Sequence, residues 1–330
     1  LWEMLRGGTT TIVDMYMFER VVAEECARVG MRGILGQALL DFPTPDFASW
    51  EAKIEGTREF AKAFHAHPLI TPAVAPHAPY SVSSEHLQEC HRLALELDCP
   101  LIIHLAETRS EHDIITQQYG DSPITYLDRL GILSERMIAA HVVWPQDEEI
   151  PILAARGVGV GHCPQSNAKL ACGVAPIVRM IRAGVQVGLG TDGCASNNDL
   201  DMWQEMQTAN FLQKLTCNDA TVMSARETLE LATIGGARAA HMQDQIGSLE
   251  VGKKADLIVV RIDGSHQIPI YDPISQLCYT TKSSDVTQVY IEGQRVMQNG
   301  IVNAIDEVEL RHAVAEQALR VQEILRRKQP

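Results

Sequence analysis

Short apolar runs alternate with longer amphipathic segments up to Asp192, and this alternation constrains the fold more than any other feature. The runs have the length of strands, and the segments between them have helical length and periodicity. Alternating strands and helices build a parallel sheet, because each helix returns the chain to the same edge. The predicted strands are 9–16, 31–40, 69–77, 100–107, 137–143, 157–162 and 185–192, and the predicted helices are 19–29, 48–63, 84–97, 123–130, 147–155 and 176–183.

Many of these strands end in His, Glu or Asp, which favours a closed barrel over a doubly wound sheet. In a barrel the strand C-termini converge on one face, where the chemistry lies. We therefore predict an α/β fold over residues 1–243: a (β/α)8 TIM-type barrel lacking its first strand, with the second to eighth strands present.

The pattern changes after Asp192. Helices are predicted at 200–215 and 225–240, followed by strands at 256–262 and 286–297, the second broken by the turn residues Glu292-Gly293. We predict that residues 244–303 form the C-terminal half of a small appended β-sandwich domain. Residues 304–330 are predicted to carry a C-terminal helix, over about 306–327.

Net charge and composition limit the classes of molecule that the protein can bind. The 28 basic residues against 42 acidic ones give a net charge of −14, which argues against nucleic acid or an anionic membrane as the main partner. No apolar run is long enough to span a membrane. The eight cysteines are scattered without a C-x-x-C pair, as expected for reduced thiols in a cytoplasmic protein. A homo-oligomer remains compatible with the sequence.

Polar side chains at the ends of apolar strands need an explanation, because unpartnered burial there costs several kcal/mol. Such residues follow four of the predicted strands: His77, His104 with Glu107, His141, and Asp192. Positions three apart on a continuing strand face opposite sides, so His104 and Glu107 reach one mouth only if the backbone turns after Leu105.

This set of residue types suits a hydrolase that uses a metal-activated hydroxide. A zinc site combines imidazole nitrogens with a carboxylate and leaves a position for water, while a separate carboxylate moves protons. Each residue alone also has a structural interpretation: a strand-end His can be a satisfied rim residue, and Asp192 can be a turn former.

Several motifs, in order and spacing, resemble the amidohydrolase superfamily and, within it, the 5′-methylthioadenosine/S-adenosylhomocysteine deaminases. They are HLAETRSE, AAHVV, GVGVGHCPQSNAKLACGVAPI, GLGTDGCASNNDLDMWQEM, ATIGGARAA and IGSLEVGKKADLIVV. The P-x-S-N-x-K-L and G-T-D-G-x-A-S-N-N runs are specific to that neighbourhood, and the match covers essentially all of the chain.

The resemblance implies roles for these residues. His104 and Asp192 would be metal ligands, Glu107 the general acid/base, and His141 a catalytic residue that orients the attacking water; Asp192 would accept the proton of that water. Glu107, His77 and Glu19 would bind substrate, Glu19 through ribose hydroxyls, although Glu19 could instead be an ordinary acid at a helix N-terminus. The implied cofactor is one divalent ion, zinc before iron, nickel or manganese.

The implied reaction is hydrolytic deamination of an adenine nucleoside (5′-methylthioadenosine, S-adenosylhomocysteine or adenosine) to the hypoxanthine nucleoside and ammonia. Glu107 would protonate the ring nitrogen beside the amino-bearing carbon, so that hydroxide adds there. The alternatives are a guanine-type deaminase, a triazine chlorohydrolase, or a catalytically incompetent fragment that acts only as a binding module.

Two features depart from the family. Its first barrel strand carries an H-x-H ligand pair upstream of the position that Leu1 matches, so we expect an N-terminally incomplete chain with half of the ligand set, unable to catalyse alone. The H-x-H here, His65-Ala66-His67, precedes a strand and is expected on the opposite face. Some relatives also bind the amino-acid carboxylate of S-adenosylhomocysteine with arginines that lie between the third and fourth barrel strands. The corresponding segment here, residues 41–68, contains a single arginine, Arg58.

Overall fold

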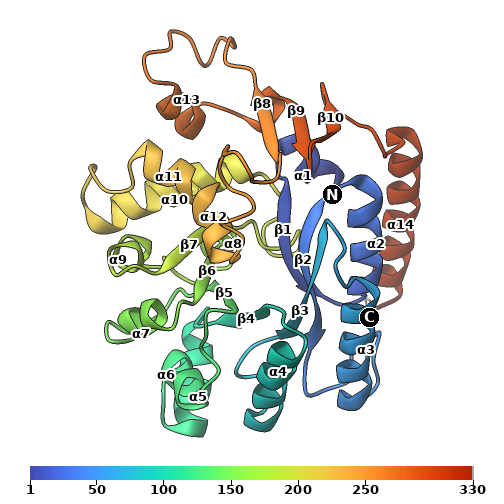
Figure 1. The fold of residues 1–330 in the computed structure, drawn as a ribbon, viewed down its shortest axis with the longest axis vertical. Helices are drawn as coiled ribbons and strands as arrows, with labels where there is room; N and C mark the ends of the chain where they lie inside the picture. The colour runs from blue at the N-terminus through green and yellow to red at the C-terminus, as the bar shows by residue number, and fades with distance from the viewer. Residues whose placement is uncertain (329–330) are drawn as a thin grey trace.

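The computed structural model describes residues 1–328. Seven parallel strands pair in chain order into one curved sheet, with helices on its outer side (Figure 1). The strands are β1 (Thr11–Tyr16), β2 (Arg32–Leu39), β3 (Ile70–Pro76), β4 (Leu101–Leu105), β5 (Met137–His141), β6 (Gly159–His162) and β7 (Gln186–Leu189). All seven predicted strands are confirmed, and the sheet is a barrel short of one strand, with β1 and β7 at its edges.

Burial explains why these segments are strands. Every residue of β2 is buried, as expected for a strand covered on one face by helices and on the other by the barrel interior. The helices that connect the strands are α2 (Glu19–Val29), α3 (Trp50–Ala63), α4 (Ser84–Glu96), α5 (Arg109–Tyr119), α6 (Pro123–Arg129), α7 (Glu149–Ala155), α8 (Pro164–Lys169) and α9 (Ile177–Arg182). The six predicted helices of this region are confirmed, whereas α5 and α8 were not predicted.

A second, four-stranded antiparallel sheet follows, with the order β11-β10-β9-β8. Its strands are β8 (Leu257–Val260), β9 (Val286–Ile291), β10 (Gln294–Gln298) and β11 (Ile301–Val302). The predicted break at Glu292-Gly293 is a hairpin turn in which both residues have positive φ, 52° and 74°. Among residues 1–328 the small domain consists of this one antiparallel sheet, and the predicted sandwich stays a prediction. The sheet packs on α1 (Trp2–Gly7) and α2.

Buried ion pairs attach the small sheet to the barrel. The Arg32 side chain at the start of β2 is 2% exposed; its guanidinium donates to both oxygens of Asp256, at 2.8 and 3.0 Å, and to Glu292, at 2.7 Å. Asp256 precedes β8 and Glu292 lies in the β9–β10 turn, so one guanidinium holds two segments of the small sheet against the barrel.

The remaining helices are α10 (Met202–Cys217), α11 (Ala225–Leu231), α12 (Ile234–Ala239), α13 (Pro273–Tyr279) and α14 (Glu307–Lys328), with a 3-10 turn at Ser283–Asp285. The single helix predicted at 225–240 is wrong, because Thr233 leaves helical geometry with φ −125° and ψ −102°. This break lets α12 turn onto β6 and β7.

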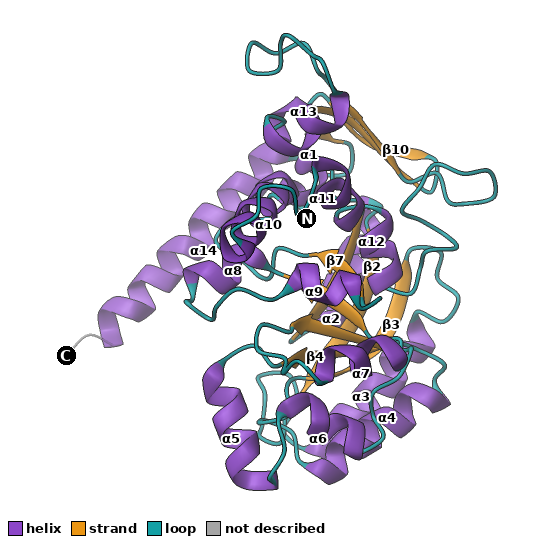
Figure 2. Ribbon diagram, turned by 90° about the vertical axis from the view of Figure 1, so that its left-hand side faces the viewer, coloured by secondary structure: helices purple, strands orange, loops and turns teal. Residues whose placement is uncertain are grey.

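The C-terminal helix is confirmed as α14, which extends away from the body of the molecule (Figure 2). The last two residues of the predicted 304–330 unit lie outside the described residues. Among residues 1–328, no helix combines the length and apolarity needed to cross a membrane.

Candidate functional site

The predicted site residues all lie at the C-terminal ends of the parallel strands. His104 is in β4 and His141 ends β5, while the other members follow their strands within three residues: Glu19 after β1, His77 after β3, Glu107 after β4 and Asp192 after β7. In a barrel this edge forms the face where substrate binds. The topology therefore gathers residues that are up to 173 positions apart in sequence (192 − 19).

Three histidines form a connected cluster. The ring centroids of His77 and His104 are 5.0 Å apart, and those of His104 and His141 are 5.4 Å apart. His104 Nδ1 donates to the His77 carbonyl at 2.9 Å, which leaves Nε2 with a free lone pair. Burial lowers the pKa of His104 and lowers that of His77 to about 4. Both rings are therefore neutral near pH 7, the form in which imidazole binds a metal.

Glu107 reaches the same mouth through a sharp backbone turn. Ala106 has a left-handed φ of 50°, which confirms the predicted turn after Leu105. Glu107 Oε2 lies 3.9 Å from His141 Nε2, and the Cys172 thiol donates to Glu107 Oε1 at 3.6 Å. A carboxyl group is thus placed beside the histidine cluster, as a proton donor and acceptor requires.

Asp192 and His141 are each oriented by α8. Ser166 Oγ donates to Asp192 Oδ2 at 2.6 Å, and His141 Nδ1 donates to Asn167 Oδ1 at 3.0 Å. Burial acts to raise the pKa of Asp192, but the hydrogen bonds from Ser166 and Gly193 and the nearby histidines outweigh it and lower this pKa. Asp192 therefore stays ionised. No role was predicted for Ser166 or Asn167 from the sequence, although the P-x-S-N motif was the signal for them.

Left-handed backbone accompanies most of these residues. His141 and Asp192 have φ values of 74° and 60°, and Phe18, just before Glu19, has 59°. Such conformations cost about 1 kcal/mol or more outside glycine and concentrate at functional sites. The strain is a reason to assign these side chains a function beyond packing.

Glu19 is fully buried, and neither of its carboxylate oxygens has a hydrogen-bond partner. Burial, with a smaller effect from the Asp14 carboxylate, raises its pKa to about 9. Asp46 Oδ2 accepts the Phe18 N–H at 2.8 Å and so fixes the turn that leads into Glu19. Glu19 does begin α2, as the helix-terminus interpretation requires, but its unpaired oxygens also fit a group that waits for a ligand.

The β1 strand contributes a residue that the sequence analysis missed. Asp14 has a raised pKa, caused by burial and, to a smaller degree, by the negative charge of Asp192. Asp14 lies two residues before the end of β1, and no sequence motif identified it. His162, at the end of β6, is 1% exposed with both ring nitrogens unpartnered, and burial lowers its pKa to about 3.

His104 and Asp192 have the chemistry of two ligands for a divalent metal, a neutral imidazole with a free nitrogen and an ionised carboxylate. They are not joined by a third ligand here: residues 1–328 contain no group of three or more His, Cys, Asp or Glu side chains that could hold a metal ion. His67 Nδ1 accepts the N–H groups of Leu69 and Ile70 at 3.2 Å each, which places the His65-Ala66-His67 run at the start of β3, the end opposite to His77.

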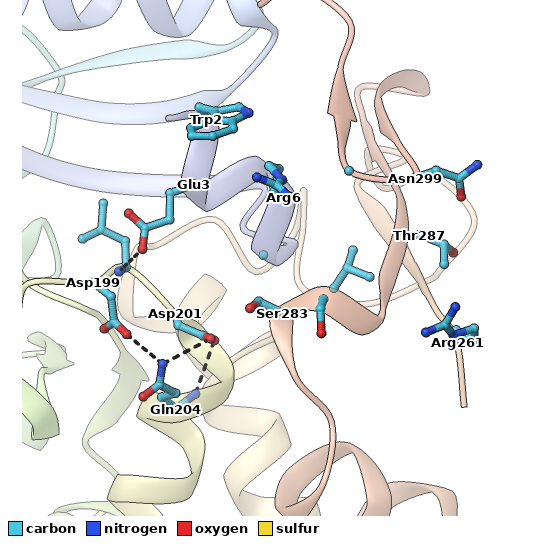
Figure 3. A pocket seen from close by; sticks show the side chains of 15 residues that line it. Trp2, Glu3, Arg6, Asp199, Asp201, Gln204, Arg261, Ser283, Thr287 and Asn299 are labelled. Atoms are coloured by element: carbon cyan, nitrogen blue, oxygen red, sulfur yellow. Dashed lines mark hydrogen bonds between the residues drawn. The ribbon is translucent and has the colours of Figure 1, made fainter. Parts of the chain in front are cut away.

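A hollow of about 710 Å³ lies elsewhere, between α1, the segment before α10 and the small sheet (Figure 3). There Glu3 accepts the Leu200 N–H at 3.0 Å, and Gln204 donates to Asp199 at 2.7 Å. None of the predicted site residues lines this hollow. It is therefore not the site formed by the strand ends.

Comparison with known proteins gives a family and close relatives. Residues 1–296 match the model of the amidohydrolase family. A 5-methylthioadenosine/S-adenosylhomocysteine deaminase of Syntrophobacter fumaroxidans is 44% identical over 93% of this chain and 70% of that protein. The crystal structure of an adenosine deaminase from Xanthomonas campestris with bound zinc superposes with a TM-score of 0.95 at 41% identity, over 98% of this chain and 73% of that one.

A more distant structure is that of atrazine chlorohydrolase from Arthrobacter aurescens, complexed with zinc. Its TM-score is 0.88 at 26% identity, over 96% of this chain and 74% of that chain.

Proposed function

The chain belongs to the amidohydrolase family, and we propose that it is a hydrolytic deaminase that converts an adenine nucleoside to the hypoxanthine nucleoside and ammonia. The observation that carries the proposal is the meeting of neutral His104, ionised Asp192 and the Glu107 carboxyl at one end of the sheet. The two deaminases compared above are 44% and 41% identical to this chain, against 26% for the chlorohydrolase, so deamination is favoured over dechlorination.

The proposal includes one divalent ion, zinc, with His104 and Asp192 among its ligands. Bound there, it would supply an activated water molecule. Zinc is chosen because the bacterial adenosine deaminase and the chlorohydrolase are both described with it.

The chain's own residues move the protons and orient the groups. Glu107 donates a proton to the ring nitrogen beside the amino-bearing carbon, which makes that carbon electrophilic. Asp192 takes the proton of the attacking water and is kept ionised for this by Ser166. His141 orients the water through Nε2, because its Nδ1 is already bound to Asn167. Asp192 then passes the proton taken from the water to the amino group, which leaves as ammonia, and the new hydroxyl on the ring carbon returns a proton to Glu107 as the carbonyl of hypoxanthine forms.

Glu19 and His77 are proposed to bind the nucleoside. Glu19 would accept hydrogen bonds from the ribose hydroxyls, because both of its carboxylate oxygens lack a partner in the protein. The amino-acid tail of S-adenosylhomocysteine needs a cation, and Arg58 is instead paired with Glu96 on the outer helices. We therefore propose 5′-methylthioadenosine or adenosine as the preferred substrate. A cytoplasmic location is part of the proposal, supported by eight cysteines that are all free.

The test is release of ammonia by the zinc-loaded protein, expressed from its complete gene, with methylthioadenosine, adenosine, S-adenosylhomocysteine, guanine and a chlorotriazine. We expect ammonia from the first two substrates and a lower kcat/KM for the third. Chloride release from the triazine, or ammonia from guanine alone, would replace the proposal by one of its alternatives. Nucleoside binding without turnover would make the protein a binding module.

A further inference from the structure

Glu111, which lies in α5 and is not one of the predicted site residues, has an unusual set of partners. The residue is 1% exposed, and its carboxylate turns back to the segment just before its own helix, where Oε1 accepts the Ala106 N–H at 2.9 Å and Oε2 accepts the Glu107 N–H at 2.8 Å. Its own N–H donates to the Thr108 hydroxyl at 3.1 Å. Both oxygens are thus used to hold the two residues of the turn.

The turn needs such support. An alanine at φ 50° is in a conformation that costs about 1–2 kcal/mol relative to ordinary backbone. If the strand continued straight, Glu107 would face the side opposite to His104. Glu111 binds the two N–H groups only when Ala106 adopts the left-handed conformation, so its hydrogen bonds select the geometry in which Glu107 faces the site.

We propose that Glu111 is the positioning residue of the general acid/base Glu107, an inference that rests on the proposed deaminase function for its kinetic part. A carboxylate is required because both partners are donors. A glutamine would accept one N–H but turn its own NH2 group toward the other, which leaves two donors facing each other in a buried place.

Cys172 offers a readout that does not depend on catalysis. Its thiol donates to Glu107 Oε1, and burial together with the Glu107 charge raises the pKa of this thiol to about 11. When Glu107 leaves its place, the thiolate becomes easier to form and reacts faster with an alkylating reagent. Cys90, fully buried in another part of the core, reports general loosening in the same sample.

The experiment compares the wild type with Glu111→Gln, Glu107→Gln and a matched control, Glu149→Gln. Glu149 is 2% exposed and also binds backbone donors, the N–H groups of Thr125 at 3.0 Å and Gln146 at 2.7 Å, but it does not touch the turn. We expect Glu111→Gln and Glu107→Gln to raise the alkylation rate of Cys172 about tenfold, with Cys90 unchanged. We expect no such increase in Glu149→Gln.

For deamination, Glu111→Gln is expected to lower kcat by about 10- to 100-fold with KM within about threefold, because misplacement of a catalytic group affects the transition state more than ground-state binding. If Glu111→Gln does not fold, the double variant Ala106→Gly/Glu111→Gln replaces it, since glycine adopts positive φ without the strain. An alkylation rate of Cys172 that is unchanged in Glu111→Gln, or that rises equally in Glu149→Gln, would overturn the proposal. A wild type inactive on every adenine nucleoside would refute the proposed function, while the alkylation result still decides the role of Glu111.

Discussion

At the scale of single residues, the site is made of side chains whose protonation is set by burial and by a few hydrogen bonds. Asp192 is ionised because Ser166 and Gly193 donate to it, and His77 and His104 are neutral because burial lowers their pKa values. Glu19 is the exception, since among residues 1–328 neither of its buried carboxylate oxygens has a hydrogen-bond partner. Its partners, on the proposed function, belong to the substrate.

The buried Glu19 makes stability depend on pH. Its folded-state pKa of about 9 lies above the value of 4.5 expected in the unfolded chain. Its stabilising contribution is therefore complete below pH 4.5 and is lost progressively as the pH rises from 4.5 to 9. We expect Glu19→Gln to increase the free energy of unfolding at pH 8 by about 2 kcal/mol or more, and to reduce its dependence on pH, in urea titrations.

The control for Glu19 is Glu24→Gln on the same helix, whose side chain is 58% exposed. It should change stability by less than about 0.5 kcal/mol at any pH. If Glu19→Gln is no more stable than the wild type at pH 8, the carboxyl group is not held uncompensated in the folded state.

The Ser166 hydroxyl is predicted to matter for activity more than for stability. Ser166→Ala removes the 2.6 Å hydrogen bond to Asp192, a bond to a charged group worth about 1.5–3 kcal/mol. We expect kcat to fall by about 10- to 100-fold, and the acid limb of the kcat profile to move to higher pH. Ser166→Thr, which keeps the hydroxyl, should recover most of the rate. Equal rates in the Ala and Thr variants would show that the hydroxyl has no part in catalysis.

At the scale of elements, α12 packs on β7 with the backbone of the helix close to the backbone of the strand. A Cβ added at Gly188 in β7 would meet the Gly236 Cα at 2.6 Å, whereas one added at Gly236 would meet Leu231 O at an ordinary 3.5 Å. The backbones of strand and helix therefore touch through glycine. This contact explains why the segment 225–240 bends at Thr233 instead of continuing as one helix.

The two glycines give a paired test of this contact. Gly188→Ala should destabilise the protein by about 1–3 kcal/mol because backbone must move. Gly236→Ala should be neutral or stabilise by up to about 1 kcal/mol, the usual gain for alanine inside a helix. Thermal unfolding of both variants measures the difference, and equal melting temperatures would contradict the close packing of α12 on β7.

At the scale of the whole molecule, the barrel and the small sheet are joined by charges. Arg32 is buried between Asp256 and Glu292, and such a pair is strongly destabilised when one partner is lost. We expect Asp256→Ala to cost about 3–5 kcal/mol. The exposed pair between Arg311 and Glu307 on α14 is the control: Glu307→Ala should cost less than about 1 kcal/mol in the same denaturation experiment. If Asp256→Ala and Glu307→Ala both lose less than about 1 kcal/mol of unfolding free energy, Arg32 must pair with other groups when Asp256 is removed.

Much of this organisation could be predicted from the sequence. The period of the apolar residues identified the seven strands, and the hairpin at Glu292-Gly293 followed from its turn residues, because both are local properties of the chain. The positions of His104, Glu107, His141 and Asp192 at strand ends were likewise visible, since parallel strands must present their C-termini on one face.

Other features depended on contacts between distant segments. The support of Asp192 and His141 by α8, the turn at Ala106 held by Glu111, and the burial of Glu19 each require side chains that meet only after folding. The break at Thr233 likewise arises from packing of α12 on β7. Local periodicity thus determined which elements form and in which order. The protonation states and orientations of the site residues were decided by the tertiary structure, because burial and hydrogen bonding are properties of the assembled fold.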